Sequence, residues 1–230
     1  MTASICPQTG RPLVLHAALV GSLIFGAMCL VGCTGLFHSN ARPEQVYFLR
    51  ATTSSQGAAA PAPVQVSLRF SRPAANPGLD SPQIVLVQSD RRMSYFLASR
   101  WPAPVPNLIE TLAVEKLRAS GSWQSVADST SVFPSDYVIQ VTVRRFEADY
   151  TGGGAAPDVH VALDCIVGKR EGREVIASFL AEDSATATAN KLSAVVAAFE
   201  TAANAALDSL SIQTLEAVRT TITHRTAEQR

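Results

Sequence analysis

His160 and Asp164, in the stretch "DVHVALDCIV" (residues 158–167), are the side chains whose types could cooperate in proton transfer. Apolar residues alternate in this stretch, which predicts a strand, and side chains four positions apart on a strand point to the same face. At ~3.3 Å per residue the two lie about 13 Å apart, too far to form a catalytic pair unaided. No serine nucleophile elbow, His-Glu-x-x-His pair or Cys-x-x-Cys pair occurs in the chain. The sequence therefore gives no positive case for catalysis, and no recognisable cluster of metal ligands.

Two further features of this region suggest chemistry but favour structural interpretations. Cys165 alternates with apolar residues, which predicts a small core residue more than a reactive thiol. The stretch "TGGGAAPD" (residues 151–158) is glycine-rich, but it lacks the following Lys and Ser or Thr, and the helix, that a phosphate-binding P-loop requires. We expect a flexible hairpin loop there.

Cys33 ends an apolar run that extends from Leu13 to Leu30 without a formal charge. The run is long enough for a membrane span, but no cluster of Lys and Arg follows it, so it predicts a signal peptide (residues 1–32). In a bacterial lipobox, diacylglycerol is attached to a cysteine and the chain is cleaved directly before it. The chain resembles this motif at Leu30, Val31, Gly32 and Cys33. We predict cleavage between Gly32 and Cys33 and lipidation of Cys33; the alternative is an uncleaved anchor with an incidental cysteine.

Processing at this site would leave Cys165 as the one free thiol. Cys6 and Cys29 would leave with the signal peptide, and Cys33 would be alkylated. No intramolecular disulfide could then form, and a chain of this size can bury its core without one. The full chain has 19 Lys and Arg against 19 Asp and Glu, so loss of Arg11 leaves 18 against 19, a formal charge of −1. Bulk charge therefore does not favour nucleic acid as a partner.

Short apolar runs separated by turns follow a predicted tether (residues 33–45) and indicate a β-rich domain. A linker or mobile loop rich in Ala, Ser and Pro interrupts them at residues 51–63. The turn "GKREG" predicts an antiparallel hairpin. The predicted strands cover residues 46–49, 64–70, 83–88, 93–98, 137–146, 159–167 and 173–182.

Two helices complete the predicted domain. The first begins at Asn107, the expected N-cap, with Glu110 as its capping-box partner, and it ends at residues 120–121. Lys116 is expected to lie mostly away from its apolar face.

The second predicted helix runs from Lys191 to about Val218 and carries an apolar stripe typical of a helix packed on a sheet. Residues 221–230 form a polar tail. Together these elements predict one domain at residues 46–220. Its class is α/β, on the border of α+β, with a mixed, mostly antiparallel sheet covered by two main helices.

Several segments, in this order, resemble the ABC-type transport auxiliary lipoproteins, a family that includes the lipoprotein of the paraquat-inducible (Pqi) intermembrane transport system. The resemblance extends from about Val46 to Leu210 and depends on the order and spacing of individually loose motifs. These are the lipobox, "VYFL", "MSYFLASRWPAPVPNLIETLAVEKLRASGSWQSV", "DYVIQVTVRRFEAD" and "VVAAFETAANAALDSL".

This resemblance implies a three-layer fold with a mixed sheet and a non-catalytic lipoprotein of the outer membrane that faces the periplasm. It implies lipid as the transported class, no cofactor, and an MCE-domain protein as the partner, with a second copy of the chain as a further candidate. The family's Tyr and Arg-Trp segment matches Tyr95, Arg100 and Trp101, which are therefore candidate partner-binding residues. The alternative for Arg100 and Trp101 is structural, with the Trp packed under a loop and the Arg bracing the end of an element.

Two functions remain open at this point. The protein is either a docking component of a lipid-transport assembly or a periplasmic carrier with its own apolar cavity. A carrier needs a cavity of several hundred cubic ångströms, whereas the Ala-rich second helix suggests close packing on the sheet. We therefore favour docking.

Overall fold

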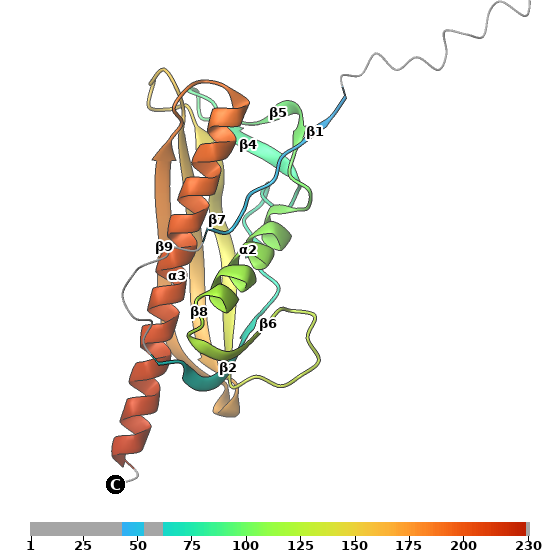
Figure 1. Ribbon diagram of the computed structural model, residues 1–230. Helices are drawn as coiled ribbons and strands as arrows, with labels where there is room; N and C mark the ends of the chain where they lie inside the picture. The colour runs from blue at the N-terminus through green and yellow to red at the C-terminus, as the bar shows by residue number, and fades with distance from the viewer. Residues whose placement is uncertain (1–42, 53–61, 229–230) are drawn as a thin grey trace, which may run out of the picture. The chain divides into compact units, whose positions relative to one another are not determined.

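A computed structural model of the chain describes residues 43–52 and 62–228 (Figure 1). The chain divides into two units, Met1–Pro43 and Glu44–Arg230, and the described elements belong to the second. The predicted signal peptide, Gly32, Cys33, most of the tether, and residues 53–61 of the predicted loop lie outside the described residues.

The centre of the sheet is a long hairpin and the strand that follows it. β7 (Tyr137–Asp149) pairs antiparallel with β8 (Asp158–Lys169) along its whole length, and β8 pairs antiparallel with β9 (Glu174–Thr186). The glycine-rich stretch at residues 151–158 connects β7 to β8, as predicted. The predicted "GKREG" hairpin is also confirmed, and its turn contains the 3-10 helix η1 (Glu171–Arg173).

The other edge of β7 is shared by three short strands in succession. β2 (Val64–Phe70), β3 (Ala74–Ala75) and β4 (Gln83–Val87) each pair parallel with a different part of β7. β2, β3 and β4 therefore follow one another along the same edge of β7.

The remaining strands extend the sheet outward from these short ones. β6 (Trp123–Ala127) pairs parallel with β2, β5 (Met93–Arg100) pairs antiparallel with β4, and β1 (Gln45–Val46) pairs parallel with β5. In the described residues, nine strands thus form one open mixed sheet. The longest pairings, of β7 with β8 and of β8 with β9, are antiparallel.

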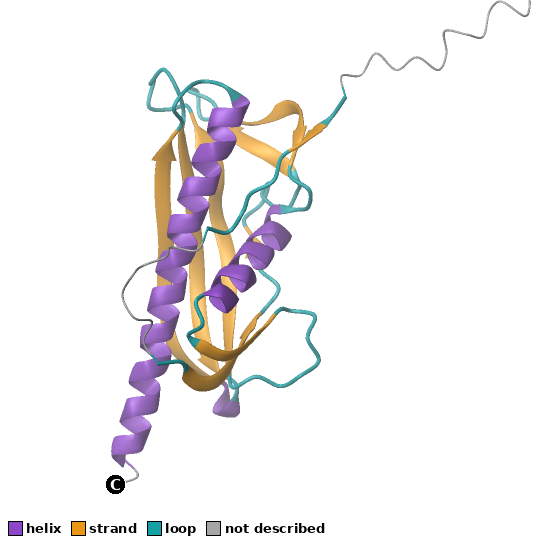
Figure 2. Ribbon diagram, in the orientation of Figure 1, coloured by secondary structure: helices purple, strands orange, loops and turns teal. Residues whose placement is uncertain are grey.

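α2 (Val105–Ala119) and α3 (Leu192–Glu228) lie on the same face of this sheet (Figures 1 and 2). Alternate residues of β7 face them and are buried, while Gln140 and Arg144 on the opposite face are exposed. The mixed, open sheet and its two helices confirm the predicted α/β class. Within the described residues they form one layer of sheet and one of helices, and the third layer that the resemblance implied is not among them. Within the described residues, no helix is long and apolar enough to cross a membrane.

The core fills the space between helices and sheet. Its largest fully buried side chains include Trp101, Phe146 and Phe199, which come from the end of β5, from β7 and from α3. Cys165 on β8 is buried among them, which confirms the prediction of a core residue.

The start of α2 differs from the sequence prediction. The helix begins at Val105, with Pro104 as an N-cap residue that gives no side-chain cap, and Pro106 in the first turn has the backbone angle that a helix start needs. Glu110 does not complete a capping box: its Oε1 accepts a 2.7 Å hydrogen bond from the backbone N–H of Ser129. Lys116 is only 5% exposed, so its predicted position away from the apolar face is wrong.

Three other elements differ in extent. The segment predicted as a strand at residues 46–49 forms only the short strand β1 (Gln45–Val46) and one further backbone hydrogen bond, from the N–H of Tyr47 to the carbonyl of Arg100 at 2.9 Å; Arg50 and Thr52 then bond to α3. β3 and β6 were not predicted, because such short strands carry almost no periodic signal. α3 continues to Glu228, through most of the predicted polar tail.

Candidate functional site

The junction between β5 and α2 contains two of the predicted partner-binding residues, and the structure separates their roles. Trp101 has 0% exposure, and its ring centroid lies 5.8 Å from that of Phe146 and 5.3 Å from that of Phe199, both in edge contacts. Its backbone N–H donates to the carbonyl of Pro82 at 2.7 Å. Trp101 is therefore a core residue and cannot contact a partner at the surface, which corrects the prediction for this residue.

Arg100 and Tyr95 remain accessible. The Nε of Arg100 donates to Oε2 of Glu44 at 2.7 Å, and both side chains are partly exposed, so this ion pair connects β5 to the first residues of the domain. Tyr95 is also partly exposed. Both residues belong to β5, and Arg100 lies beside β1, the edge strand of the sheet.

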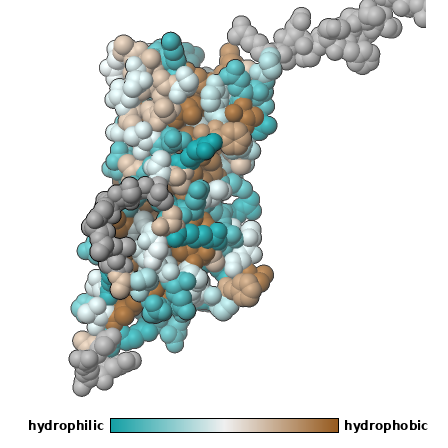
Figure 3. Space-filling model, in the orientation of Figure 1, coloured by the Kyte–Doolittle hydropathy of each residue, from teal (hydrophilic) through white to brown (hydrophobic). Residues whose placement is uncertain are grey.

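An apolar surface surrounds Tyr95. Met93, Tyr95 and Leu97, which we call the β5 ridge, alternate along one strand and are all exposed, Leu97 to 93%. Phe48, which follows β1, is exposed too. Figure 3 shows hydrophobic residues gathered at the surface where Figure 1 places β1 and β5.

A backbone irregularity accounts for the prominence of Leu97. The next residue, Ala98, has φ = 51°, in the left-handed region that a non-glycine residue rarely adopts. The pairing between β4 and β5 also shifts register between Gln83 and Val85. β5 therefore bulges away from its partner strand, and Leu97 is directed outward. Such strain persists only where the surrounding structure imposes it, and it often occurs at functional surfaces.

A buried polar group joins the two helices. The Nζ of Lys116 on α2 donates to the backbone carbonyl and to Oδ1 of Asn204 on α3, at 3.0 and 3.2 Å, and lies 2.8 Å from Oδ1 of Asp208. A lysine ammonium that is almost fully removed from water needs such partners to remain charged.

The same asparagine holds the N-terminal segment. Oδ1 of Asn204 accepts from the backbone N–H of Thr52 at 2.8 Å, and its Nδ2 donates to the carbonyl of Arg50 at 2.9 Å. The N–H of Arg50 donates to Oε2 of Glu200 at 2.9 Å. Residues 50–52 are thus fixed on α3, directly after β1. We call this set of contacts the Asn204 lock.

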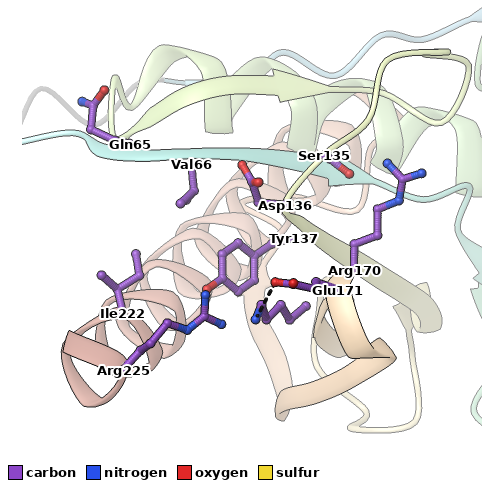
Figure 4. Close-up of a pocket in the computed structure, with 10 residues that line it drawn as sticks. Gln65, Val66, Ser135, Asp136, Tyr137, Arg170, Glu171, Ile222 and Arg225 are labelled. Carbon is purple, nitrogen blue, oxygen red and sulfur yellow. Dashed lines mark ion pairs between the residues drawn. The ribbon is translucent and has the colours of Figure 1, made fainter. Parts of the chain in front are cut away.

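A second feature is a pocket of about 600 Å³, formed by β2, the start of β7, the β8–η1 turn and the C-terminal part of α3 (Figure 4). In Figure 4, Ile222 and Arg225 lie on one side, Glu171 on the other and Tyr137 between them. We call it the Lys169 pocket. Its lining residues are Gln65, Val66, Ser135, Asp136, Tyr137, Lys169, Arg170, Glu171, Ile222 and Arg225.

Opposite charges meet in the Lys169 pocket. The Nζ of Lys169 lies 3.1 Å from Oε2 of Glu171, and this hydrogen bond, together with the charges of Lys169 and Arg225, holds the pKa of Glu171 below its ordinary value. Oδ2 of Asp136 accepts 2.7 Å hydrogen bonds from the backbone N–H and the hydroxyl of Ser67, which lower the pKa of Asp136.

The residues that first suggested catalysis are not brought together. Asp164 forms an ion pair with Arg144 at 3.4 Å. His160 lies opposite Glu147 and Ser184 in the sheet. Burial, and to a lesser extent the neighbouring charge of Asp164, raises the pKa of the Cys165 thiol to about 12, so it is not a nucleophile near neutral pH. Nowhere in residues 43–52 and 62–228 do three or more potential ligands gather as a metal site would need.

Sequence reasoning missed both Asn204 and Lys169. Asn204 is a polar residue within an alanine-rich, otherwise apolar stripe, and this break in the pattern was the available signal. Lys169 and Arg225 carried no signal, because 56 positions separate them in the sequence.

Comparison with known proteins identifies the family of the chain. Residues 47–210 match the model of a family described as ABC-type transport auxiliary lipoprotein component. The crystal structure of a protein from Xanthomonas campestris is similar, with 25% sequence identity and a TM-score of 0.69, covering 78% of this chain and 99% of that one. An uncharacterised protein of known structure, 16% identical with a TM-score of 0.55, covers 74% of this chain and 97% of its own length and has the same fold. No curated protein matched.

Proposed function

Since this chain belongs to the family of ABC-type transport auxiliary lipoprotein components, we propose that it is a non-catalytic docking component of an MCE-type intermembrane lipid-transport system. In this proposal Cys33 carries the lipid anchor, the outer membrane holds it, and residues 44–228 face the periplasm. The cargo is lipid, and the partner is an MCE-domain protein.

The observation that carries docking is the β5 ridge. Exposed aromatic side chains, methionine and arginine are the residue types enriched in protein interfaces. Tyr95 and Arg100 provide these types next to Leu97, whose side chain is almost fully exposed on a strained bulge. We propose that the β5 ridge, with Arg100, contacts the MCE-domain partner.

The Asn204 lock supports the proposal that the N-terminal segment tethers the domain to its lipid anchor. Cys33 lies ten positions before Pro43, where the described structure begins, and residues 50–52 are fixed on α3 shortly after. An anchor at Cys33 would therefore lie no more than about 35 Å of extended chain from Pro43.

The packing of the core favours docking over the carrier alternative. Trp101, Phe146 and Phe199 fill the space between α3 and the sheet through direct ring contacts, at centroid distances of 4.9 to 5.8 Å. A lipid-sized cavity in this layer would require these rings to separate.

The anchor is tested by mass spectrometry of the mature N-terminus. We expect residue 33 as the N-terminal residue, carrying three acyl chains, because a single chain holds a protein only marginally. An intact Met1 or an unmodified Cys33 would contradict the anchor. Thr34, rather than Asp, predicts outer-membrane sorting by the rule known in enteric bacteria, and membrane fractionation tests this separately.

Docking is tested by co-purification of the full chain from its native membranes, with variants Leu97→Asp and Tyr95→Ala. Each should reduce capture of an MCE-domain protein about 30-fold, the effect of losing an anchor residue worth roughly 2 kcal/mol. Val132→Asp is the matched control, because Val132 is also almost fully exposed but lies in the β6–β7 loop. An equal loss of partner capture in all three variants, or a loss in none of them, would contradict the proposal that the β5 ridge contacts the partner. A purified chain that carries stoichiometric lipid would favour the carrier.

A further inference from the structure

The first residues of the domain run from the edge of the sheet to α3 (Figure 1). We call residues 44–52 the strap. At one end of the strap, β1 pairs with the end of β5, and the N–H of Tyr47 donates to the carbonyl of Arg100 at 2.9 Å. At the other end, the Asn204 lock holds residues 50–52 on α3. Both ends of the strap are therefore fixed to the folded domain.

Side chains along the strap alternate between the core and the surface. Leu49 is only 7% exposed, and Tyr47 and Ala51 are partly buried against the core. Val46 and Phe48, which lie between these positions, are 39% and 65% exposed. This alternation is that of an extended chain, in which successive side chains point to opposite sides. The strap thus has an apolar outer face, formed by Val46 and Phe48.

The neighbours of Phe48 keep it at the surface. A tyrosine suits an exposed position better than a phenylalanine, because its hydroxyl can bond to water, yet Tyr47 is the residue that packs inward. A shift of the strap by one residue would bury Phe48 and expose Leu49. The burial of Leu49 and the Asn204 lock prevent this shift. Phe48 is therefore held at the surface against the usual preference for burying its ring.

The outer face of the strap continues the apolar surface of the β5 ridge. Val46 pairs with Arg100, which lies three positions after Leu97 on β5. Seven steps along β5 from Met93 and two along the strap reach Phe48, so the whole surface is roughly 30 Å long at ~3.3 Å per residue. A standard interface buries about 800 Å² on each partner, which corresponds to a round patch roughly 30 Å across. One partner can therefore contact both the ridge and the strap.

We propose that the outer face of the strap extends the docking surface of the β5 ridge, and that Asn204 positions it. This inference rests on the proposed function, because the partner is the same MCE-domain protein. Phe48 and Val46 contact the partner, whereas Asn204 is 7% exposed and acts only through the strap. The strap also leads to the predicted anchor at Cys33, so membrane attachment and partner capture share one segment of chain. Release of the strap from α3 would remove Phe48 from the docking surface.

The contact is tested by co-purification of the full chain from its native membranes. Phe48→Asp should reduce capture of the MCE-domain protein about 30-fold, the loss typical of an anchor residue in an interface. Ile212→Asp is the matched control, because Ile212 is 61% exposed but lies on α3, and it should leave capture unchanged. Both variants should keep the native midpoint of urea unfolding, because both side chains are largely exposed.

A double-mutant cycle tests the positioning role of Asn204. Asn204→Ala should reduce capture about tenfold in the native background. It should have no further effect in the Phe48→Asp background, because the strap then has no contact to position. If Asn204 supported only the stability of the fold, Asn204→Ala would reduce capture by the same factor in both backgrounds, because fewer molecules would be folded.

The outcomes separate the strap from the ridge. If Leu97→Asp reduces capture and Phe48→Asp behaves like Ile212→Asp, the strap contact is overturned and the proposed function stands. If Phe48→Asp reduces capture and Leu97→Asp does not, the strap contact is supported and the ridge is contradicted. A native chain that captures no MCE-domain protein would overturn both. Equal factors for Asn204→Ala in the two backgrounds would overturn its positioning role.

Discussion

Trp101 offers the most direct test of the core described above. Replacement of a buried Trp or Phe by Ala costs about 3–5 kcal/mol through lost burial and the resulting cavity. Two edge contacts, to Phe146 and Phe199, add roughly 0.5–1.5 kcal/mol each. The Nε1 of Trp101 is buried without a partner, so its removal returns about 1–3 kcal/mol. With the middle of each range, we expect Trp101→Ala to lower the free energy of unfolding by about 4 kcal/mol.

The assay is urea unfolding of the soluble domain from Ala41 onward, followed by far-ultraviolet circular dichroism. Fluorescence is less suitable because the chain has only two Trp residues and one is removed. Such a loss is a large part of the 5–15 kcal/mol that stabilises a typical domain. The urea concentration at the midpoint of unfolding should therefore fall markedly.

Two companion variants define the refuting result. Trp101→Phe keeps an aromatic ring in the core and removes the unpartnered N–H, so it should lose less than half as much as Trp101→Ala. Leu97→Ala, in the same strand but 93% exposed, should change stability by no more than about 0.5 kcal/mol. A loss below about 1 kcal/mol for Trp101→Ala would refute the packing of this residue against the two phenylalanine rings.

Three further predictions concern the lock, the thiol and folding. Asn204→Ala should lower the free energy of unfolding by about 2–3 kcal/mol, because it leaves the N–H of Thr52 and the carbonyl of Arg50 without partners. Limited proteolysis should then cut near residue 52 before the rest of the domain, and unchanged proteolysis would contradict the lock. Because the pKa of the Cys165 thiol is about 12 in the folded state and lower when unfolded, its contribution to stability is complete below about pH 9 and lost between pH 9 and 12, by about 1.4 kcal/mol per unit. The difference in urea stability between the native protein and Cys165→Ala should show this slope, and a pH-independent difference would refute it. The soluble domain from Ala41 should fold under reducing conditions, and a requirement for oxidant would show that the interpretation of its cysteines is wrong.

The sequence was informative wherever one element carried its own signal. The two-residue period of residues 137–146 and 159–167 identified β7 and β8 and placed Cys165 in the core. The glycine-rich stretch and the "GKREG" turn identified the connections on either side of β8. These signals are local, because the alternation of a strand and the chemistry of a turn depend on adjacent residues.

Local signals failed where a residue's partner came from elsewhere. Glu110 occupies the third position of an apparent capping box, but it bonds to Ser129 in the loop after β6. Lys116 has a polar side chain at a position that should face water, but Asn204 and Asp208 on α3 hold it in the interior. Residues 46–49 have strand-like composition, but the segment leaves the sheet after the bond from Tyr47 to Arg100, and Arg50 and Thr52 bond to α3.

The sequence by itself determined the long strands β7, β8 and β9, the apolar stripe of the last helix, the family resemblance and the absence of a recognisable catalytic motif. Only the tertiary structure decided that Trp101 is buried, that Leu97 projects from a bulge, and that Lys169 and Arg225 share a pocket. The physical reason is distance along the chain. Periodicity records which face of an element is apolar, but the partner of a given side chain depends on how elements dozens of residues apart pack against each other.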